Sequence, residues 1–194
     1  MPDHRQPSII LRLPLELRER IYNFCYNDDE SAAPTWKFNE PAITRISKAI
    51  RSEALPLYYG AYPLIIQSYV KCDARGCIWF KTNRSYRQLL ASKISWIRRL
   101  RIRFGFSEHY FGEPVAIEFT IELDQRHGGY SINHCFGEGW TSDARDPAER
   151  EEILLILKHH LTESLTTSIA THGIGHFTVV DLDRLVDVNA NSLP

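Results

Sequence analysis

The chain has 194 residues, of which 43% are hydrophobic and 24% charged, and its 23 basic and 24 acidic side chains give a formal net charge of -1 at pH 7. This composition is typical of a globular domain, and it excludes global disorder, a collagen-like chain and a disulfide-dense mini-protein. A net charge near zero also disfavours a general binder of nucleic-acid phosphates, although it leaves a local basic patch open.

The sequence shows no targeting or membrane segment. No run reaches the roughly 18 apolar residues of a membrane span. The apolar stretch near the N-terminus is interrupted by Arg12 and Glu16, so it does not resemble a signal peptide. Four cysteines without a secretion signal indicate reduced thiols. We therefore expect an intracellular protein of the cytoplasm or nucleus that does not associate with a membrane.

The first sixty residues predict two helices. In LPLELRERIYNFCY the apolar side chains recur with helical spacing, and they predict one apolar helix face made of Leu13, Leu17, Ile21, Phe24 and Cys25. A second helix is expected to begin near Pro41, and Pro56 is expected to kink or end it because proline removes a helical hydrogen bond.

The rest of the chain mixes strand and helix patterns. Segments 63–70 and 77–80 predict a hairpin, and three alternating segments between residues 97 and 136 predict an antiparallel meander. Leucine and isoleucine every four residues predict a long helix from Pro147 to His172, followed by a last strand over 176–182. The expected fold class is α+β: a helical N-terminal module (residues 1–60) packed on a mainly antiparallel sheet domain (residues 61–194) that the long helix covers. One continuous compact domain is an alternative.

One strand carries a stripe of three arginines, Arg99, Arg101 and Arg103. The stripe could bind a phosphate backbone or an acidic partner. The alternative is that it faces solvent and pairs with Glu118 and Glu122 on the neighbouring strand. Such cross-strand pairs contribute about 0.2–1 kcal/mol each and are common in sheets. The glutamates and the balanced net charge favour the second interpretation.

Cys72 and Cys77 form a C-x₄-C pair near a predicted turn, and His134 with Cys135 could complete a tetrahedral zinc site. The spacing is loose, and residues 134 and 135 should point to opposite faces of a strand. Ordinary thiols are therefore the favoured interpretation, and we expect no metal.

Catalytic motifs are missing from the sequence. It contains no H-E-x-x-H, G-x-S-x-G, Walker A or G-x-G-x-x-G pattern. Asp124 and His127 lie close enough in sequence to act as an acid–base pair, but they occupy a turn where both residue types are ordinary. Without a nucleophile, base and orienting group in one pattern, we expect that the protein is not an enzyme and takes no cofactor.

Two segments resemble the N-terminal module of a large fungal family described as F-box-like or two-EXR-type. The segments are LRLPLELRERIY (11–22) and RISKAIRSEALPLYYG (45–60), and SWIRRLRI (95–102) resembles the strand that often follows. The resemblance covers about 45 residues firmly and about 90 loosely by motif spacing. It implies a fungal intracellular protein with an interaction role, and most members of the family have no assigned activity.

An F-box also opens with Leu-Pro-x-Glu and binds the linker subunit of an SCF ubiquitin ligase through short amphipathic helices. The resemblance carries this role to Leu13, Pro14 and Glu16, and to the apolar positions Leu17 and Ile21. Arg18 departs from the F-box pattern, which has an apolar residue there. The alternative is that Leu13, Leu17 and Ile21 pack the helix onto the chain's own sheet domain, because one amphipathic face buries one partner.

The sequence thus predicts a non-enzymatic protein-interaction module, with an F-box-like adaptor as its specific form. Trp36, Tyr58 and Tyr59 are further candidate contacts because exposed aromatic residues are good anchors, although core packing is favoured for the two tyrosines. A nucleic-acid-binding module that uses the arginine stripe is the second hypothesis. The sequence leaves the oligomeric state open.

Overall fold

The structure is a computed structural model that describes residues 9–30, 40–72, 78–82, 87, 91–106, 115–124, 127–137, 147–173 and 177–188. Its elements in chain order are η1 (Ile9–Arg12), α1 (Leu15–Glu30), η2 (Ala42–Arg45), α2 (Lys48–Ala61), β1 (Leu64–Cys72), β2 (Ile78–Thr82), α3 (Ala91–Ile94), β3 (Arg99–Phe106), β4 (Val115–Asp124), β5 (Gly129–Phe136), α5 (Pro147–His172) and α6 (Val179–Val186). None of these helices combines the length and the apolar character that a bilayer span requires.

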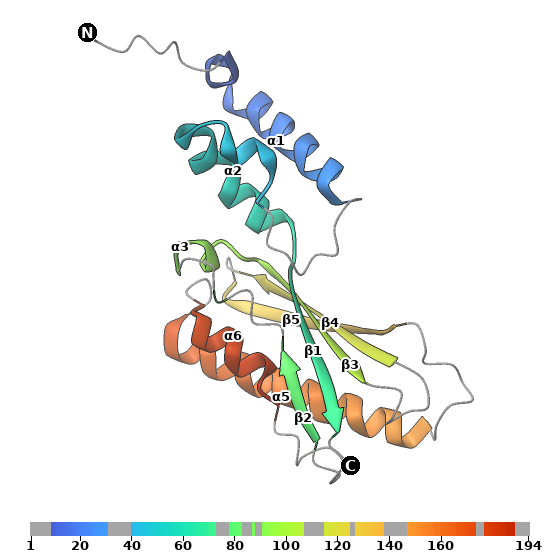
Figure 1. Ribbon diagram of the computed structural model, residues 1–194. Helices are drawn as coiled ribbons and strands as arrows, with labels where there is room; N and C mark the ends of the chain where they lie inside the picture. The colour runs from blue at the N-terminus through green and yellow to red at the C-terminus, as the bar shows by residue number, and fades with distance from the viewer. Residues whose placement is uncertain are drawn as a thin grey trace.

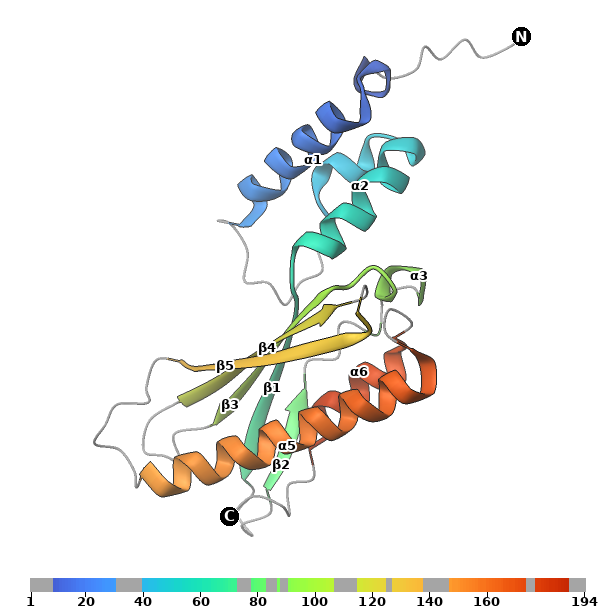
Figure 2. The same ribbon diagram turned by 180° about the vertical axis from the view of Figure 1, so that it is seen from behind.

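The protein has the expected α+β fold. Helices α1 and α2 lie beyond one end of a twisted sheet, and α5 and α6 cover one face of that sheet (Figures 1 and 2). The long covering helix has the predicted bounds, and Gly173 with its positive φ follows its last residue. Its buried leucines Leu157, Leu161 and Leu165 recur every four residues and form one apolar stripe.

The sheet has five strands in the order β2-β1-β3-β4-β5. The β1–β2 hairpin and the β3-β4-β5 meander are antiparallel, as predicted, whereas β1 and β3 run parallel. The parallel pair places Ile66 beside Ile102 in the centre of the sheet. Antiparallel sheets commonly bury one face against the core and leave the other face open to solvent.

The main core lies between the sheet and the helices α5 and α6. Leu100, Ile102 and Phe104 alternate along β3 and are almost fully buried, and Phe119 on β4 packs edge-on against Phe104. Alternate residues of the same strands face the other way and are mostly polar. The period-2 pattern of the sequence therefore separates a buried face from an open face.

A second, smaller core lies between α1 and α2. It contains Tyr22 and Tyr26 from α1 and Ile50 and Ala54 from α2, all with at most 1% of their surface exposed. Tyr58 packs against both cores. The helical module therefore has its own apolar interior, and α2 connects that interior to the sheet.

Helix α2 begins at Lys48 and not near Pro41, where the chain forms the short helix η2 instead, and Pro56 does not end α2. Pro56 lies inside the helix, which continues to Ala61. The carbonyl that loses its helical donor belongs to Ser52, four residues earlier, and Ser52 is exposed. Water can hydrogen-bond this carbonyl, which lowers the cost of the proline. Ser47 begins the helix by accepting a hydrogen bond from the backbone N–H of Ile50 at 3.2 Å.

The predicted last strand was wrong. Its described residues from Val179 onward belong to α6, whose N-terminus is a capping box. The Thr178 side chain accepts from the backbone N–H of Asp181, and the Asp181 carboxylate accepts from the backbone N–H of Thr178 at 2.8 Å. These reciprocal bonds satisfy two donors at the helix start and favour the helix over an extended segment.

Candidate functional site

The candidate site is the outer face of α1, where the sequence predicted partner-binding residues. Pro14, Glu16 and Leu17 are exposed, and Leu13 and Ile21 are half-buried. Trp36, the other predicted contact, lies outside the described residues. Phe24 continues the same face seven residues after Leu17, with 68% of its surface exposed against 44% for Leu17.

The inner face of α1 is held by tyrosines. The Tyr22 hydroxyl donates to Oε2 of Glu53 at 3.0 Å, and the Tyr26 hydroxyl donates to the backbone carbonyl of Ala54 at 2.6 Å. Tyr26 also packs edge-on against Tyr58 and Tyr62. Each tyrosine thus buries its ring and satisfies its hydroxyl, as buried tyrosines usually do.

Arg18 belongs to this inner face and not to the outer one. Its Nε lies 3.1 Å from Oε2 of Glu53, and its Nη1 donates to the Leu11 carbonyl at 3.1 Å. Burial and, to a smaller extent, the hydrogen bond to the Glu53 carboxylate together raise the pKa of Tyr22 to about 12. The departure from the F-box pattern at Arg18 therefore serves the contact between α1 and α2.

This arrangement divides the predicted apolar face of α1. The sequence grouped Leu13, Leu17, Ile21, Phe24 and Cys25 on one face. Cys25 packs partly buried against the core of the helical module, whereas the residues fully buried against α2 are Tyr22 and Tyr26. Sequence periodicity alone missed them because tyrosine is weighted as half-polar. The signal that could have found them is the i, i+4, i+8 series of Arg18, Tyr22 and Tyr26. Tyr59, favoured as a core residue, is buried as expected.

The arginine stripe lies on the open face of the sheet. Arg99 is ion-paired with Glu122 and Arg101 with Glu118, each pair at 3.2 Å. Arg103 is exposed and lies in register with Glu118, and it forms no ion pair within the described ranges. The pairing expected from the glutamates on β4 thus involves two of the three arginines.

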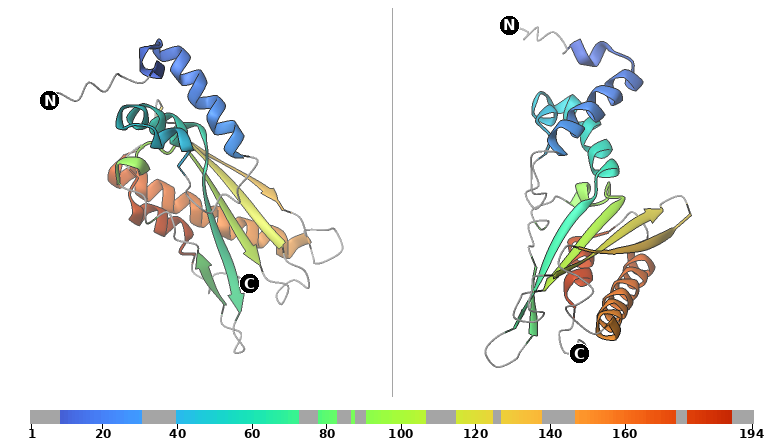
Figure 3. Two further views of the ribbon diagram at one scale, coloured as in Figure 1. Left: turned by 45° about the horizontal axis from the view of Figure 1, so that its top comes forward. Right: turned by 90° about the vertical axis from the view of Figure 1, so that its right-hand side faces the viewer.

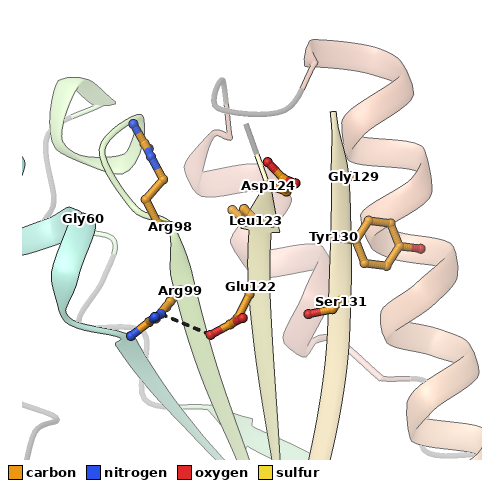
Figure 4. Close-up of a pocket in the computed structure, with 9 residues that line it drawn as sticks. All are labelled: Gly60, Arg98, Arg99, Glu122, Leu123, Asp124, Gly129, Tyr130 and Ser131. Carbon is orange, nitrogen blue, oxygen red and sulfur yellow. Dashed lines mark ion pairs between the residues drawn. The ribbon is translucent and has the colours of Figure 1, made fainter. Parts of the chain in front are cut away.

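A cavity of about 720 Å³ opens where α2 ends above the starts of β3 and β5 (Figure 4). The Arg99–Glu122 ion pair lies across its wall. Arg98 also lines it, and Nη1 of Arg98 donates to the backbone carbonyls of Ser95 and Ile97. Burial lowers the pKa of the Arg98 guanidinium. The charged side chains that line this cavity therefore have partners, either within the lining, as Arg99 and Glu122 do, or beside it, as Arg98 does.

Two other titratable clusters have structural contacts. The exposed His127 ring lies 2.6 Å from the Asp124 carboxylate, which also accepts from the His127 backbone N–H, so the two residues bind each other locally. Asp181 is fully buried, and its Oδ2 lies 3.2 Å from Nδ1 of His172. Burial raises the pKa of Asp181, but hydrogen bonds from Thr178 outweigh this effect, so the net pKa is lowered.

The weak zinc candidates are not brought together by the described part of the chain. Cys77 lies outside it, and Cys72 ends β1 opposite Ile78. His134 and Cys135 point to opposite faces of β5, because His134 is in register with Phe119 and Cys135 with Glu118. Within the described ranges, no three His, Cys, Asp or Glu side chains form a group that could hold a metal ion.

Comparisons of this chain with protein-family models, with curated proteins and with solved structures found no match.

Proposed function

We propose that this protein is a non-enzymatic protein-interaction module whose α1 helix docks onto a partner protein, in the manner of an F-box-like adaptor. The observation that carries the proposal is the division of α1 into two faces. Tyr22 and Tyr26 already bury one face against α2, yet Leu17 and Phe24 remain exposed on the other. Large exposed apolar side chains that share a face typically mark an interaction site.

The geometry of the outer face suits a helix-in-groove contact. Leu17, Ile21 and Phe24 occupy positions i, i+4 and i+7 and therefore project from the same side of α1. A leucine and a phenylalanine that enter a partner's apolar pocket supply the buried anchors on which such interfaces depend. Pro14 and Glu16 precede them and are also exposed, so the whole Leu-Pro-x-Glu opening is within reach of one partner.

The resemblance to F-box-like proteins suggests the partner's identity. In that mechanism α1 binds the linker subunit of an SCF ubiquitin ligase, and the sheet domain recognises a target protein. The alternative in which Leu17 packs on the chain's own sheet receives no support, because α1 packs on α2 and η2. The ion pairs of Arg99 and Arg101 weigh against the nucleic-acid alternative, because glutamates already bind both guanidinium groups.

The test is co-elution with a purified fungal SCF linker subunit in size-exclusion chromatography. We expect a complex with the unaltered protein and its loss in the double variant Leu17→Asp, Phe24→Asp. Both side chains are exposed, so the variant should keep its fold, which circular dichroism and thermal unfolding will verify. Val180→Asp is the matched control, because Val180 is 62% exposed on the distant α6. No complex with a folded unaltered protein, or an unchanged complex in the double variant, would contradict the proposal.

A further inference from the structure

The open face of the sheet carries an exposed aromatic side chain. Ser68 on β1 is paired with the core residue Phe104, so it points toward α5 and α6, and Tyr69 points the opposite way because side chains alternate along a strand. Figure 3 (right) shows both helices on one side of the sheet, and the described part of the chain places no helix along the other side. Tyr69 has 48% of its surface exposed there.

Two neighbours hold the Tyr69 ring in place. Gly105 lies in register with Tyr69 on β3, and a Cβ atom at this position would lie only 2.9 Å from Cδ1 of Tyr69, so the glycine leaves room for the ring. The Tyr69 hydroxyl donates to Oε1 of Gln67 at 3.0 Å. A ring that is already held in this way loses little conformational freedom when a partner covers its exposed side. Tyr69 is therefore preorganised to act as an anchor.

Two cations without a counter-charge lie beside this ring. Lys81 on β2 is in register with Tyr69, and Arg103 on β3 is in register with Gln67. Both cationic side chains are exposed, and neither forms an ion pair within the described ranges. The other two arginines of the stripe are paired with glutamates on β4. The described side chains around Tyr69 therefore carry positive charge, although the whole chain has a net charge of -1.

The spacing of the two cations fits an extended peptide. Neighbouring strands lie about 4.8 Å apart and successive residues about 3.3 Å apart, so the Cα atoms of Lys81 and Arg103 are separated by about 12 Å, with Tyr69 on the strand between them. In an extended peptide, residues i and i+4 are about 13 Å apart and point to the same side as residue i+2. Two carboxylates at i and i+4 could therefore reach both cations while an aromatic residue at i+2 packs on Tyr69.

We propose that the surface formed by Tyr69, Lys81 and Arg103 binds an extended acidic segment of a target protein, in which two acidic residues flank an aromatic one at alternate positions. This role rests on the proposed function, in which the sheet domain recognises the target. It names the recognition surface and the chemistry of the target segment. It uses no residue of α1, so the docking of α1 and the recognition of the target can be tested separately.

A peptide fits this surface better than a nucleic acid does. A nucleic acid carries one phosphate at every nucleotide. Beyond Arg103 the same face offers only Arg101 and Arg99, which Glu118 and Glu122 already bind. A peptide can place neutral side chains there. A base that stacks on Tyr69 while one phosphate binds Arg103 is the competing outcome of the test.

The test is a titration of the ¹⁵N-labelled full chain with the peptide Gly-Glu-Ser-Phe-Ser-Glu-Gly, followed by the chemical shifts of the backbone amides. We expect saturable binding, with the shifts concentrated on β1, β2 and β3. Arg103→Gln is expected to raise the Kd by about threefold or more, and Tyr69→Ala by about fivefold or more. Tyr69→Phe keeps the ring and should bind within about twofold of the unaltered protein. The amide spectra also show whether each variant is folded.

Two controls separate this surface from the rest of the chain. Lys158→Gln removes one exposed positive charge from α5, on the other side of the sheet, and should leave the Kd unchanged. A peptide with lysines in place of its glutamates should not bind, because it would place like charges together. The double variant Leu17→Asp, Phe24→Asp should bind the acidic peptide normally, so a failure of the α1 proposal would leave this result intact.

Three outcomes would overturn the proposal. The first is no saturable binding of the acidic peptide by the unaltered protein. The second is an unchanged Kd in Arg103→Gln and Tyr69→Ala, because a different surface would then bind the peptide. The third is tighter binding of single-stranded oligouridine than of the peptide, with the same dependence on Tyr69 and Arg103, because the surface would then recognise a nucleic acid.

Discussion

The ammonium group of Lys93 on α3 contacts the carboxylate of Glu40, which precedes η2. The same carboxylate pairs with Arg51 on α2 at 2.6 Å. Lys93 and Glu40 are about 14% and 16% exposed, so this is a mostly buried bridge between the helical module and the elements beside the sheet. It fixes the module through side chains that are distant in sequence.

Glu40→Gln is expected to lower the free energy of unfolding by about 2–3 kcal/mol, because it leaves the mostly buried Lys93 ammonium without its counter-charge. Arg51→Met is expected to cost less than about 1 kcal/mol, since Arg51 is 46% exposed. Urea unfolding of both variants measures the difference. Adding Lys93→Met to Glu40→Gln should recover part of the loss. If the double variant is as unstable as Glu40→Gln, the unpaired ammonium is not the cause.

Tyr22 predicts the behaviour of the helical module at alkaline pH. Its pKa is raised to about 12 from the ordinary 10, so the folded state retains the phenolic proton longer than the unfolded state. The contribution of protonated Tyr22 to the free energy of unfolding is therefore fully present below pH 10 and is lost as the pH rises toward 12. Tyr22→Phe should cost about 1–2 kcal/mol at pH 8 through loss of the Glu53 bond.

The same variant should flatten the decline in stability between pH 10 and 12. Urea unfolding at pH 8 and pH 11, with tyrosinate absorbance as a second readout, measures this effect. Tyr69→Phe removes the hydroxyl of a 48% exposed tyrosine and is the control for hydroxyl loss. An alkaline decline of the same steepness in Tyr22→Phe and in the unaltered protein would contradict the assignment.

Asp181 predicts the behaviour at acid pH. Its pKa lies below the ordinary 3.8, because the hydrogen bonds from Thr178 and the nearby His172 together outweigh the cost of burial. The stability that this provides is present above pH 3.8 and is lost as pH falls through the lowered folded pKa. Asp181→Asn should cost about 1–2 kcal/mol at neutral pH and reduce the acid sensitivity. Unfolding by urea from pH 7 to pH 2 measures both, with the exposed Glu151→Gln as control.

The fold was predicted best from the sequence in segments where apolar residues repeat at one regular spacing over many positions. The repeat of leucines at every fourth position identified α5, Pro147 and Gly173 indicated its ends, and alternation separated the two faces of β3 and β4. Alternation did not reveal that β1 pairs parallel with β3, because a pleated strand has the same pattern with either neighbour. Short apolar runs also fit strand and helix equally well. In α6 the Thr178–Asp181 capping box decided between them.

The candidate site was predicted less completely. The sequence identified α1 and the exposed positions Pro14, Glu16 and Leu17, but it did not reveal that Tyr22 and Tyr26 form the buried face of the helix. The reason is a contact between residues 31 positions apart. Glu53 accepts a hydrogen bond from the Tyr22 hydroxyl, which stabilises the tyrosine face of α1 in the buried position against α2. No local pattern contains such a partner, because only folding brings α2 beside α1.

The arginine stripe gives a last prediction, on nucleic-acid binding. Binding that released counterions from three phosphates would give a logarithmic salt slope near -2.7 on duplex DNA. Because Arg99 and Arg101 are paired with Glu122 and Glu118, we expect at most one phosphate contact, through Arg103, and a slope no steeper than about -0.9. Fluorescence anisotropy with duplex DNA and single-stranded RNA over a salt series measures the slope.

Glu118→Gln together with Glu122→Gln releases both arginines and should steepen the salt slope. A steep slope in the unaltered protein would mean that phosphates displace the glutamates. It would contradict this prediction and support nucleic-acid binding by the arginine stripe.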